Sequence, residues 1–562
     1  MPTQDLLLLN QAQIMDRTAH KFADQEAIAF KDRVLTWREL REQSFKMAKA
    51  FLQAGIKKGD RVGIMMTNIP EWVVARNAIN CVGAWLVPIN TRYKTSELKK
   101  ILSMGEVNAL VMMDKAVGID FVELMHAVCP GLAHCPPGQV NLPDLPFLKT
   151  VICLGQRDYP GMYRYEEFLD SGRTLDDETV YAVMAAVSPH DVSTLLFTSG
   201  TTGVPKGVLT THYQFTRVFG KFGERFGVQQ DDVLLGGTPF FTNFGLCTVL
   251  IFSELTGAKI AIFETFDPEE ILAGIERHGI SVFCGTPAMY TMLLHHPHFN
   301  SDKVRSMRVG DIGGAPFMPA QVREIMDKFG MTLFAAYGMT ENTGVTTVSV
   351  VGDAPELVAY TVGTKFNDEC EIKIVDVVSR QTLPPGQQGE ILTRGWNVTQ
   401  GFYNNPEGFA KAKDPEGWFL TGDLGVVDEN GYYKITGRLK DLIVSGGLNI
   451  DPVEIENFLM EHPSVGAAYV VGLPDWRMGE VVGTFIQLKD GQACTAQEIT
   501  AFCEGKIGKY KIPKYVQFIT DVPRTAVGKV QKFQLRELGL QMFNLADTDA
   551  PGRKTDCIHA GS

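Results

Sequence analysis

A run of hydroxyls and glycines follows an apolar segment in TLLFTSGTTGVPKGV, residues 194–208. Glycines let backbone N–H groups turn toward a single anion, and serine and threonine hydroxyls add further donors. A lysine directly after Pro205 supplies a positive charge. The composition predicts a loop that holds phosphate, and a surface turn rich in the same residues is the alternative. The candidate phosphate-binding residues are Thr198, Ser199, Gly200, Thr201, Thr202, Gly203 and Lys206.

Two common nucleotide loops do not match this segment. The GxxxxGK[ST] order of a Walker A loop is absent, and no GxGxxG follows a strand-like run as in a dinucleotide-binding fold. A phosphotransferase that leaves ADP would normally carry a Walker or kinase loop. The sequence therefore favours a phosphate loop of a different design.

The elements that must position this loop alternate between two patterns. EAIAF, RVGIMM, TVICLG and AKIAIF are typical of strands, whereas TWRELREQSFKMAKAFLQAG has helical spacing. This alternation predicts an α/β fold, with layered β-sheets and helices in a large N-terminal domain. Short strands and tight turns follow Glu390, and DENG (428–431) is predicted to be a hairpin turn. We expect domains at 1–437 and 438–545, the second of α+β type, and a flexible tail at 546–562.

Length and charge limit the classes of function. A chain of 562 residues is too long for one ordinary core, so two or more domains are expected. The net charge of −12 argues against nucleic acid or an anionic membrane as a partner. The ten cysteines have no CxxC pairs, and we expect reduced thiols in a cytoplasmic protein. We expect no signal peptide, because the N-terminus lacks a basic region and a cleavage pattern. We expect no membrane span, because no uninterrupted apolar segment reaches 18 residues.

Several further motifs identify a family resemblance. TSGTTGVPKG resembles the signature of the adenylate-forming superfamily, which includes acyl-CoA synthetases, luciferases and peptide-synthetase adenylation domains. GGAP, YGMTE, TGD, GRLKD, SGGLNIDPVEIE and PRTAVGK follow in the family's order. The resemblance extends from the TWREL region to about residue 535 and favours the acyl-CoA ligase branch.

The resemblance implies a role for most motif residues. An acid attacks the α-phosphorus of ATP to give an acyl-adenylate and pyrophosphate, and a thiol then displaces AMP. Two anions must meet in the first step, so positive charge and fixed geometry are needed. Lys529 would bridge the substrate carboxylate and the phosphate, Thr340 would contact the α-phosphate, and Glu341 would hold Mg²⁺. The other implied nucleotide-binding residues are Gly314, Ala315, Pro316, Tyr337, Gly338, Met339, Asp423 and Arg438.

Each of these residues also has an ordinary structural interpretation when it is taken alone. Lys529 could be a solvated loop lysine, Asp423 a turn cap and Glu341 a helix cap. Their order within the motifs favours the catalytic roles, and Asp423 with Arg438 suits a ribose. A non-catalytic nucleotide sensor would have no reason to retain Lys529 and Glu341.

The second step needs different surroundings for the same intermediate. Members of the family rotate a small, mobile C-terminal domain about a hinge, which maps to Lys440. The rotation would remove Lys529 and bring the CoA-binding strand of Ser445, Gly446, Gly447 and Leu448 beside the pantetheine. A simple β-bulge at the two glycines is the alternative.

The acyl pocket is implied by TPFFTNFG, residues 238–245, where many acyl-CoA synthetases carry PxFHxxG. Thr242 stands in place of the usual His, so a role carried by that His is in doubt. Gly338 would leave the pocket floor open, and ordinary core packing is the alternative for the phenylalanines. The predicted pocket residues are Phe240, Phe241, Thr242, Phe244, Gly245 and Gly338.

The segment 238–245 also bears on the substrate. It holds no Asp to pair an α-ammonium group, and an unpaired buried ammonium is costly, so a free amino acid is disfavoured. We expect an apolar carboxylic acid, either a medium-chain fatty acid or a cyclic acid of the benzoate or cyclohexanecarboxylate type. Free CoA is favoured over a carrier protein, because no phosphopantetheine site follows Lys529. A luciferase-like oxygenase, either direction of the reversible reaction and a homodimer are left open.

Overall fold

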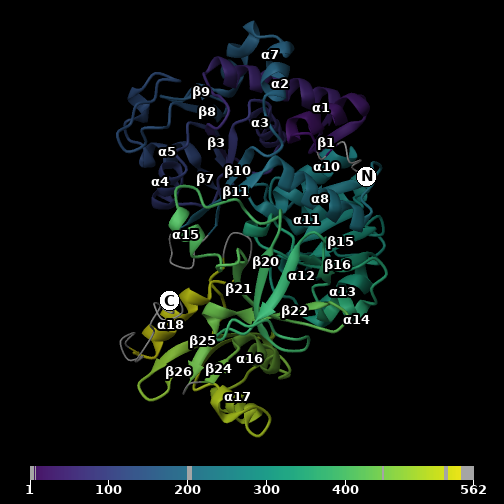
Figure 1. Ribbon diagram of the computed structural model, residues 1–562, viewed down its shortest axis with the longest axis vertical. Coiled ribbons are helices and arrows are strands. Elements are labelled where there is room, and N and C mark those ends of the chain that lie inside the picture. The colour runs from purple at the N-terminus through teal and green to yellow at the C-terminus, as the bar shows by residue number, and fades with distance from the viewer. Residues whose placement is uncertain (1–5, 7, 199–204, 446–447, 525–529, 546–562) are drawn as a thin grey trace. The chain divides into compact units, whose positions relative to one another are not determined.

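The computed structural model describes residues 6, 8–198, 205–445, 448–524 and 530–545. The chain divides into two compact units (Figure 1). The first consists of Met1–Glu371 with Thr393–Phe419, and the second of Ile372–Leu392 with Leu420–Ser562. The α/β prediction, with a large first unit and a smaller second one, is confirmed. The predicted boundary at residue 438 stays a prediction.

The first unit contains a seven-stranded sheet of strand order β11-β10-β4-β3-β5-β8-β9. All its neighbours are parallel except the β10–β11 pair. Parallel strands buried on both faces read as continuous apolar runs, and every residue of Ala109–Met113 is buried. The strands are β3 (Arg61–Met65), β4 (Trp85–Pro88), β5 (Ala109–Met113), β8 (Thr150–Leu154), β9 (Tyr163–Arg164), β10 (Val192–Thr198) and β11 (Lys206–Thr211).

Helices of this region begin at clear sequence signals. Thr36 and Thr211 form capping boxes with Glu39 and Gln214, which satisfy the first N–H groups of their helices. The helices are α1 (Gln11–Lys21), α2 (Trp37–Gln53), α3 (Pro70–Cys81), α4 (Thr95–Met104), α5 (Phe121–Val128), α6 (Tyr165–Ser171), α7 (Asp177–Ala185) and α8 (His212–Phe226). Minor elements are β6 (Lys115–Ala116), β7 (Ile119–Asp120), η2 (Leu132–His134) and η3 (Gly172–Thr174).

The nine-stranded sheet of the first unit has the order β18-β17-β16-β15-β14-β12-β13-β1-β2. Strands β16, β15, β14, β12, β13 and β1 are parallel to their neighbours in that series. The strands are β1 (Glu26–Phe30), β2 (Arg33–Thr36), β12 (Val233–Gly236), β13 (Lys259–Ile262), β14 (Val282–Gly285), β15 (Val309–Ile312), β16 (Thr332–Tyr337), β17 (Thr347–Val348) and β18 (Thr364–Lys365).

Helices follow most of these strands. Proline at the first helical position helps to start α11, α12 and α13, since its fixed φ suits that position. The helices are α9 (Asn243–Gly245), the π-helix η4 (Leu246–Ile251), α10 (Phe252–Thr256), α11 (Pro268–His278), α12 (Pro287–Leu294), α13 (Pro319–Phe329), η5 (Thr340–Asn342), α14 (Pro355–Tyr360) and α15 (Pro406–Ala410).

The second unit is built on two smaller sheets, of order β19-β20-β21-β22 and β24-β23-β26-β25, with β27 beside β26. The predicted hairpin is confirmed, because β21 and β22 pair around DENG and the Asp428 carboxylate accepts hydrogen bonds from the N–H groups of Asn430 and Tyr432. The strands are β19 (Glu371–Val375), β20 (Gly389–Arg394), β21 (Phe419–Val427), β22 (Tyr433–Arg438), β23 (Ile443–Ser445), β24 (Leu448–Ile450), β25 (Val465–Asp475), β26 (Gly479–Leu488) and β27 (Tyr515–Phe518). The helices are η6 (Leu439–Asp441), α16 (Pro452–Leu459), α17 (Ala496–Cys503), η7 (Lys509–Lys511) and α18 (Lys532–Met542).

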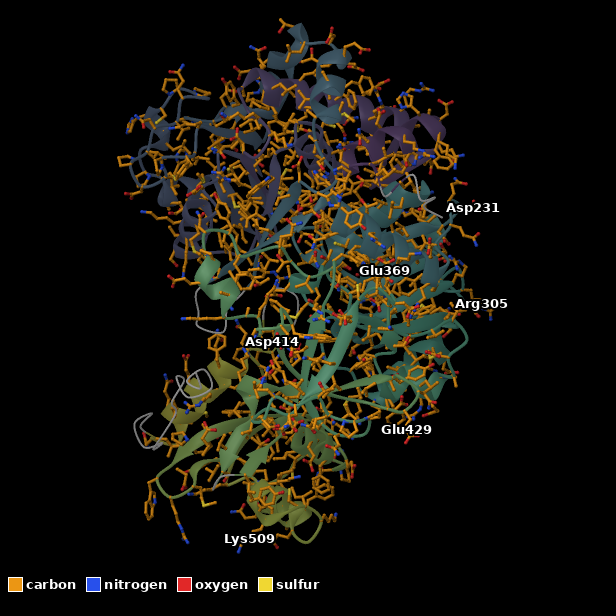
Figure 2. The ribbon with its side chains drawn as sticks, in the orientation of Figure 1. Asp231, Arg305, Glu369, Asp414, Glu429 and Lys509 are labelled. Atoms are coloured by element: carbon orange, nitrogen blue, oxygen red, sulfur yellow. The ribbon has the colours of Figure 1, made fainter. Side chains whose placement is uncertain are left out.

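Charge lies mainly at the surface of both units. Figure 2 labels Arg305, Glu369 and Lys509, all of which are exposed. Among the described residues, no helix is both long enough and apolar enough to cross a membrane. The nine cysteines in the described part of the chain are free thiols.

Candidate active site

Three of the predicted segments leave the nine-stranded sheet at the same edge. The predicted acyl segment, residues 238–245, follows β12. GGAP follows β15, and YGMTE begins at Tyr337, the last residue of β16. These strands belong to one parallel series, so their carboxyl ends meet at one edge, which is where ligands bind in open α/β sheets. The Gly313 N–H donates to the carbonyl of Gly285 at the end of β14 over 3.3 Å. The fold thus brings together segments that are up to 100 residues apart.

The turn after β16 is fixed by its own side chains. Thr340 and Glu341 begin the short helix η5, and both are half-buried. The next residue, Asn342, is fully buried and donates to Thr346 Oγ1 over 3.0 Å. The Asn342 amide oxygen accepts from Thr393 Oγ1 at 3.1 Å. These bonds hold the predicted phosphate and metal residues on a rigid support.

The backbone geometry explains why glycine occupies two positions of the predicted site. A Cβ on Gly338 would lie 1.9 Å from the carbonyl oxygen of Gly344, so only glycine fits beside that backbone. Gly314 has φ of +74°, a left-handed conformation that favours glycine. The open pocket floor predicted for Gly338 stays a prediction, beside this packing role. Ala315 is half-buried, whereas Pro316 is exposed.

The predicted phosphate-binding segment includes the end of β10 and the start of β11, which pair as antiparallel strands. Thr198 ends β10 and is paired in register with Lys206, which begins β11. The Lys206 ammonium lies 5.2 Å from the centre of the Phe402 ring, a distance that allows a cation–π contact. Ser199, Gly200, Thr201, Thr202 and Gly203 lie outside the described residues.

The acyl segment divides into core and edge residues. Phe240 is fully buried against Trp72, with ring centres 5.5 Å apart. Phe241 and Phe244 are half-buried. Thr242, in place of the family's His, caps α9: its Oγ1 donates to the Pro239 carbonyl over 2.7 Å and accepts from the Gly245 N–H at 3.1 Å. The hydroxyl of Thr242 therefore has a local structural role.

One residue at this edge was not predicted from the sequence. Asp311 lies in β15, two residues before Gly313, and is 1% exposed. Its Oδ1 has no hydrogen-bond partner among the residues that the structure describes. Burial raises the pKa of this carboxyl well above its usual range. The available signal was an acidic residue inside the apolar run that precedes GGAP.

The second unit holds the predicted ribose pair. Asp423 and Arg438 face each other across β21 and β22, with Asp423 Oδ1 2.8 Å from Arg438 Nε. The Asp423 side chain is 5% exposed and that of Arg438 is 50% exposed. Arg438 can hold the Asp423 carboxylate in place while part of the arginine side chain stays at the surface.

The predicted hinge and CoA residues follow directly in the chain. Lys440 is exposed in the single turn η6. Ser445 is buried and pairs with Leu448 and with Gly479, whereas Leu448 is 50% exposed. Gly446, Gly447 and Lys529 lie outside the described residues.

The chemistry of the donor set suits magnesium. Among the described residues, no group of three or more His, Cys, Asp or Glu side chains is placed to hold a metal ion. Mg²⁺ is usually held by one or two carboxylates together with substrate phosphates, so a single carboxylate such as Glu341 fits that ion.

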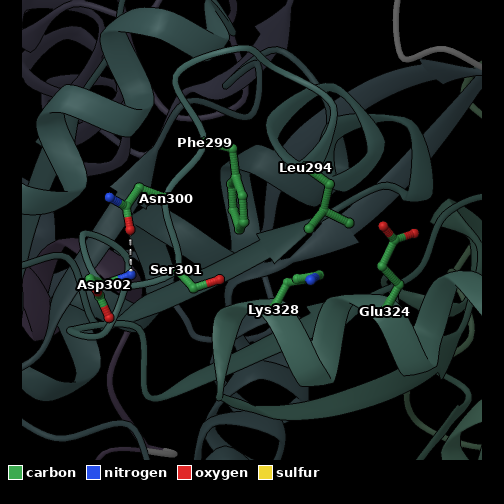
Figure 3. A pocket seen from close by; sticks show the side chains of 7 residues that line it. All are labelled: Leu294, Phe299, Asn300, Ser301, Asp302, Glu324 and Lys328. Atoms are coloured by element: carbon green, nitrogen blue, oxygen red, sulfur yellow. Dashed lines mark hydrogen bonds between the residues drawn. The ribbon is translucent and has the colours of Figure 1, made fainter.

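A separate hollow of about 420 Å³ lies in the first unit (Figure 3). It contains none of the predicted site residues, and its lining is an ordinary mixture of exposed and half-buried groups. The lining residues are Leu294, Phe299, Asn300, Ser301, Asp302, Glu324 and Lys328.

Comparisons with known proteins agree with the motifs. Residues 15–403 match the model described as AMP-binding enzyme, and residues 454–529 match the AMP-binding enzyme C-terminal domain. YngI of Bacillus subtilis (strain 168), whose name marks it provisionally as an acyl-CoA synthetase, is 36% identical over 538 residues, 95% of this chain and 98% of that protein.

Three further comparisons name substrates. A Rhodococcus jostii (strain RHA1) protein named 3-[(3aS,4S,7aS)-7a-methyl-1,5-dioxo-octahydro-1H-inden-4-yl]propanoyl:CoA ligase is 35% identical over 93% of this chain and 97% of its own. The human mitochondrial medium-chain acyl-CoA ligase ACSF2 is 34% identical over 95% of this chain and 88% of its own. The crystal structure of the anthranilate CoA ligase AuaEII with anthranoyl-AMP has a TM-score of 0.84 and 27% identity, and it covers 97% of this chain and 100% of its own.

Proposed function

This chain belongs to the AMP-binding enzyme family and is an AMP-forming acyl-CoA ligase that uses ATP, Mg²⁺ and CoA, and we propose that its acid is apolar, either medium-chain or cyclic. The family and ligase class predicted from the motifs are therefore confirmed. The named relatives include a ligase for medium-chain acids and one for a propanoyl group on a bicyclic ring. Both support the proposed acid, and neither decides between its two forms.

The proposal for the site rests on one observation, the shared sheet edge where the acyl segment, GGAP and YGMTE meet. A carboxylate bound beside Phe244 would lie near the α-phosphate contact proposed for Thr340. Mg²⁺ on Glu341 would supply charge neutralisation at the phosphates. Lys206 and Lys529 would add positive charge, which favours the approach of two anions in the first step.

The first experiment is a panel of carboxylic acids with ATP and Mg²⁺, with and without CoA, in which AMP, ADP and pyrophosphate are measured. Acid-dependent AMP that rises strongly with CoA is the expected result, and the best acid identifies the substrate class. AMP release that does not depend on CoA, together with light emission or oxygen uptake, would favour the oxygenase alternative. Acyl transfer to a carrier protein but not to CoA would favour the carrier alternative, and ADP would contradict the proposal.

Lys529→Ala tests the catalytic lysine. We expect adenylation to fall by about 10²–10³-fold, because a charge that acts at the reacting phosphate is lost. Lys509→Ala is the matched control, since it removes an exposed lysine of the same unit. An equal loss in both variants would refute the assignment.

Lys440→Pro tests the hinge. Proline fixes φ, so we expect thioester formation to fall more than adenylation when the two half-reactions are measured separately. Lys440→Ala, which removes the same side chain but leaves φ free, should keep both. Equal losses in both half-reactions of Lys440→Pro would defeat the hinge role.

The place and assembly of the enzyme complete the proposal. We propose a cytoplasmic location and small-molecule partners, namely the acid, ATP and CoA. A homodimer is one proposed assembly, and light scattering of the purified chain measures its mass.

A further inference from the structure

Asp311 has a carboxyl group that the fold buries. The side chain lies in β15 at 1% exposure, and its Oδ1 has no hydrogen-bond partner in the described part of the chain. Buried polar groups are almost always hydrogen-bonded, because an unpaired one keeps its full desolvation penalty. A carboxyl in this position lowers stability and invites a functional explanation.

Gly313 and Gly314 lie close to this carboxyl and to the predicted acyl segment. A Cβ placed on Gly313 would lie 3.6 Å from Asp311 Oδ2 and 3.0 Å from the Ala336 carbonyl oxygen. A Cβ on the next residue, Gly314, would lie 4.0 Å from the ring of Phe244. Gly313 is therefore close to the carboxyl of Asp311, and the next residue, Gly314, is close to the half-buried ring of Phe244.

Cys284, which is paired with Asp311, and Thr248, which contacts the Cys284 thiol, are both neutral polar groups. Thr248 is buried on η4, and its hydroxyl donates to the Phe244 carbonyl over 3.0 Å. Cys284 is paired in register with Asp311 across β14 and β15, and burial raises the pKa of its thiol well above the usual range. Since both neighbours stay uncharged, the surroundings suit a neutral ligand group.

The protonation state of Asp311 decides which ligand group it can bind. Burial raises the pKa of the Asp311 carboxyl well above its usual range, because burial penalises the charged form and favours the neutral acid. A neutral carboxyl donates one O–H and also accepts. It can therefore donate to a carbonyl oxygen, or donate to and accept from a hydroxyl.

We propose that Asp311 is a specificity-determining residue that hydrogen-bonds a keto or hydroxyl oxygen on the acyl group of the substrate. The acid is then mostly apolar but carries one oxygen function on the part that passes Gly313. This inference rests on the proposed function, because it assumes that the acyl group lies at this sheet edge. It narrows the substrate from apolar acids in general to oxygenated ones.

The test compares matched pairs of acids that differ by one oxygen. Cyclohexanecarboxylate is compared with its 3- and 4-oxo and hydroxy derivatives, and octanoate with its oxo derivatives along the chain. For each acid, kcat/KM of CoA-dependent AMP formation is measured. We expect the wild-type enzyme to favour the best oxygenated acid over its parent by about tenfold or more, because the parent leaves a buried carboxyl unpaired.

Two variants separate hydrogen bonding from shape. Asp311→Leu should bring that preference to about one or below, because it loses activity on the oxygenated acid and gains activity on the parent. Asp311→Asn keeps a neutral donor and acceptor of the same size and should keep most of the preference. If Asp311→Leu fails to fold, Asp311→Ala provides the same comparison.

Several outcomes would overturn the proposal. These are an unchanged preference in Asp311→Leu, and a wild-type enzyme that favours no oxygenated acid at any position. A third is a preference for amino-substituted acids that Asp311→Asn abolishes, which would assign the carboxylate to an ammonium group. If no acid supports AMP formation in any variant, the proposed function itself has failed, and that result is distinct from the other three.

Discussion

Two carboxyl groups of the first unit are almost equally buried and have opposite surroundings. Glu254 on α10 is 4% exposed and forms an ion pair with Arg76, which is itself 1% exposed. Arg76 also donates hydrogen bonds of 3.0 Å to the side-chain oxygens of Gln11 and Asn77. Asp311 on β15 has no comparable partner in the described chain. Glu254 is part of a network that joins three helices, whereas Asp311 lies in an interior strand and its Oδ1 has no hydrogen-bond partner among the described residues.

This difference separates a requirement of folding from a requirement of function. The network around Glu254 lies where α1, α3 and α10 pack, and Arg76 bonds to the carboxylate and to two amide oxygens inside the core. Among the described residues, Gln11 Nε2 and Asn77 Nδ2 of the same network have no hydrogen-bond partner. Folding alone gives no reason for Asp311, because a smaller apolar residue would fill the same strand position without a desolvation penalty. Departures from internal consistency of this kind are expected at functional sites.

The largest expected effect comes from breaking the buried ion pair. Glu254→Ala leaves the Arg76 guanidinium buried without its carboxylate, which typically costs about 3–5 kcal/mol. We expect a large fall in the midpoint of the first unit in urea unfolding followed by circular dichroism. Glu254→Gln is the matched control, because it retains a hydrogen-bond acceptor, and it should lose less. A midpoint unchanged in Glu254→Ala would show that the network does not stabilise the unit.

Removing both charges sharpens the same point. Replacing a buried pair by apolar residues is often close to neutral, so Arg76→Met with Glu254→Met should be more stable than Glu254→Ala alone. The Asn77 amide oxygen loses its Arg76 donor, whereas that of Gln11 still accepts from Asn80 Nδ2 at 3.1 Å. The unpaired Asn77 oxygen should still leave a deficit of about 1–3 kcal/mol from the wild type. The same urea experiment measures both. A double variant as unstable as the single one would mean that the loss comes from packing and not from the unpaired charge.

Much of this arrangement could be predicted from the sequence. The apolar runs predicted the α/β class, and DENG predicted a hairpin, because both depend on local patterns. The motif order indicated that Gly313–Pro316 and Tyr337–Glu341 belong to one site, and the adjacent parallel strands β15 and β16 provide the geometry.

The remaining features depend on contacts between distant segments. Asp311 is an ordinary acidic residue in the sequence, and its isolation depends on what β14, η4 and Gly313 place around it. The capping role of Thr242 and the close approach of Gly344 to Gly338 likewise required backbone coordinates. Patterns of residue type do not encode such distances.

A third prediction concerns the pH dependence of Asp311. Its folded pKa is raised, so its contribution is fully present below the unfolded pKa of about 4 and is lost as pH rises through the folded value. The stability of the wild type relative to Asp311→Asn should therefore fall above about pH 4, by at most about 1.4 kcal/mol per pH unit. Urea midpoints of both proteins between pH 4 and 8 measure this difference. A difference that rises with pH, or stays flat, would mean that the carboxyl ionises freely in the folded state.

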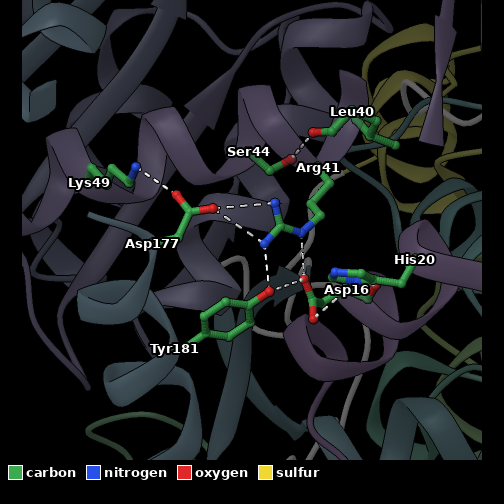
Figure 4. A network of polar contacts seen from close by, with 8 residues as sticks. All are labelled: Asp16, His20, Leu40, Arg41, Ser44, Lys49, Asp177 and Tyr181. Carbon is green, nitrogen blue, oxygen red and sulfur yellow. Dashed lines mark hydrogen bonds and ion pairs between the residues drawn. The ribbon is translucent and has the colours of Figure 1, made fainter. Parts of the chain in front are cut away.

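The smallest effect is expected in a half-exposed network that provides a contrast to the buried pair (Figure 4). Asp177 lies 3.4 Å from a guanidinium nitrogen of Arg41 and 2.7 Å from the ammonium of Lys49, and its side chain is 44% exposed. Ion pairs at such exposure contribute little, so Asp177→Asn should cost about 0.5 kcal/mol. Because salt screens exposed charges, the difference should shrink further in 1 M NaCl.

The matched control for this network is Asp16→Asn. Asp16 accepts from Arg41 Nε over 2.6 Å and is 16% exposed, so its loss should be larger and less sensitive to salt than that of Asp177. If Asp177→Asn destabilised the unit as much as Glu254→Ala does, burial would not be the property that separates these networks. The contrast between Glu254 and Asp311 would then need another physical basis.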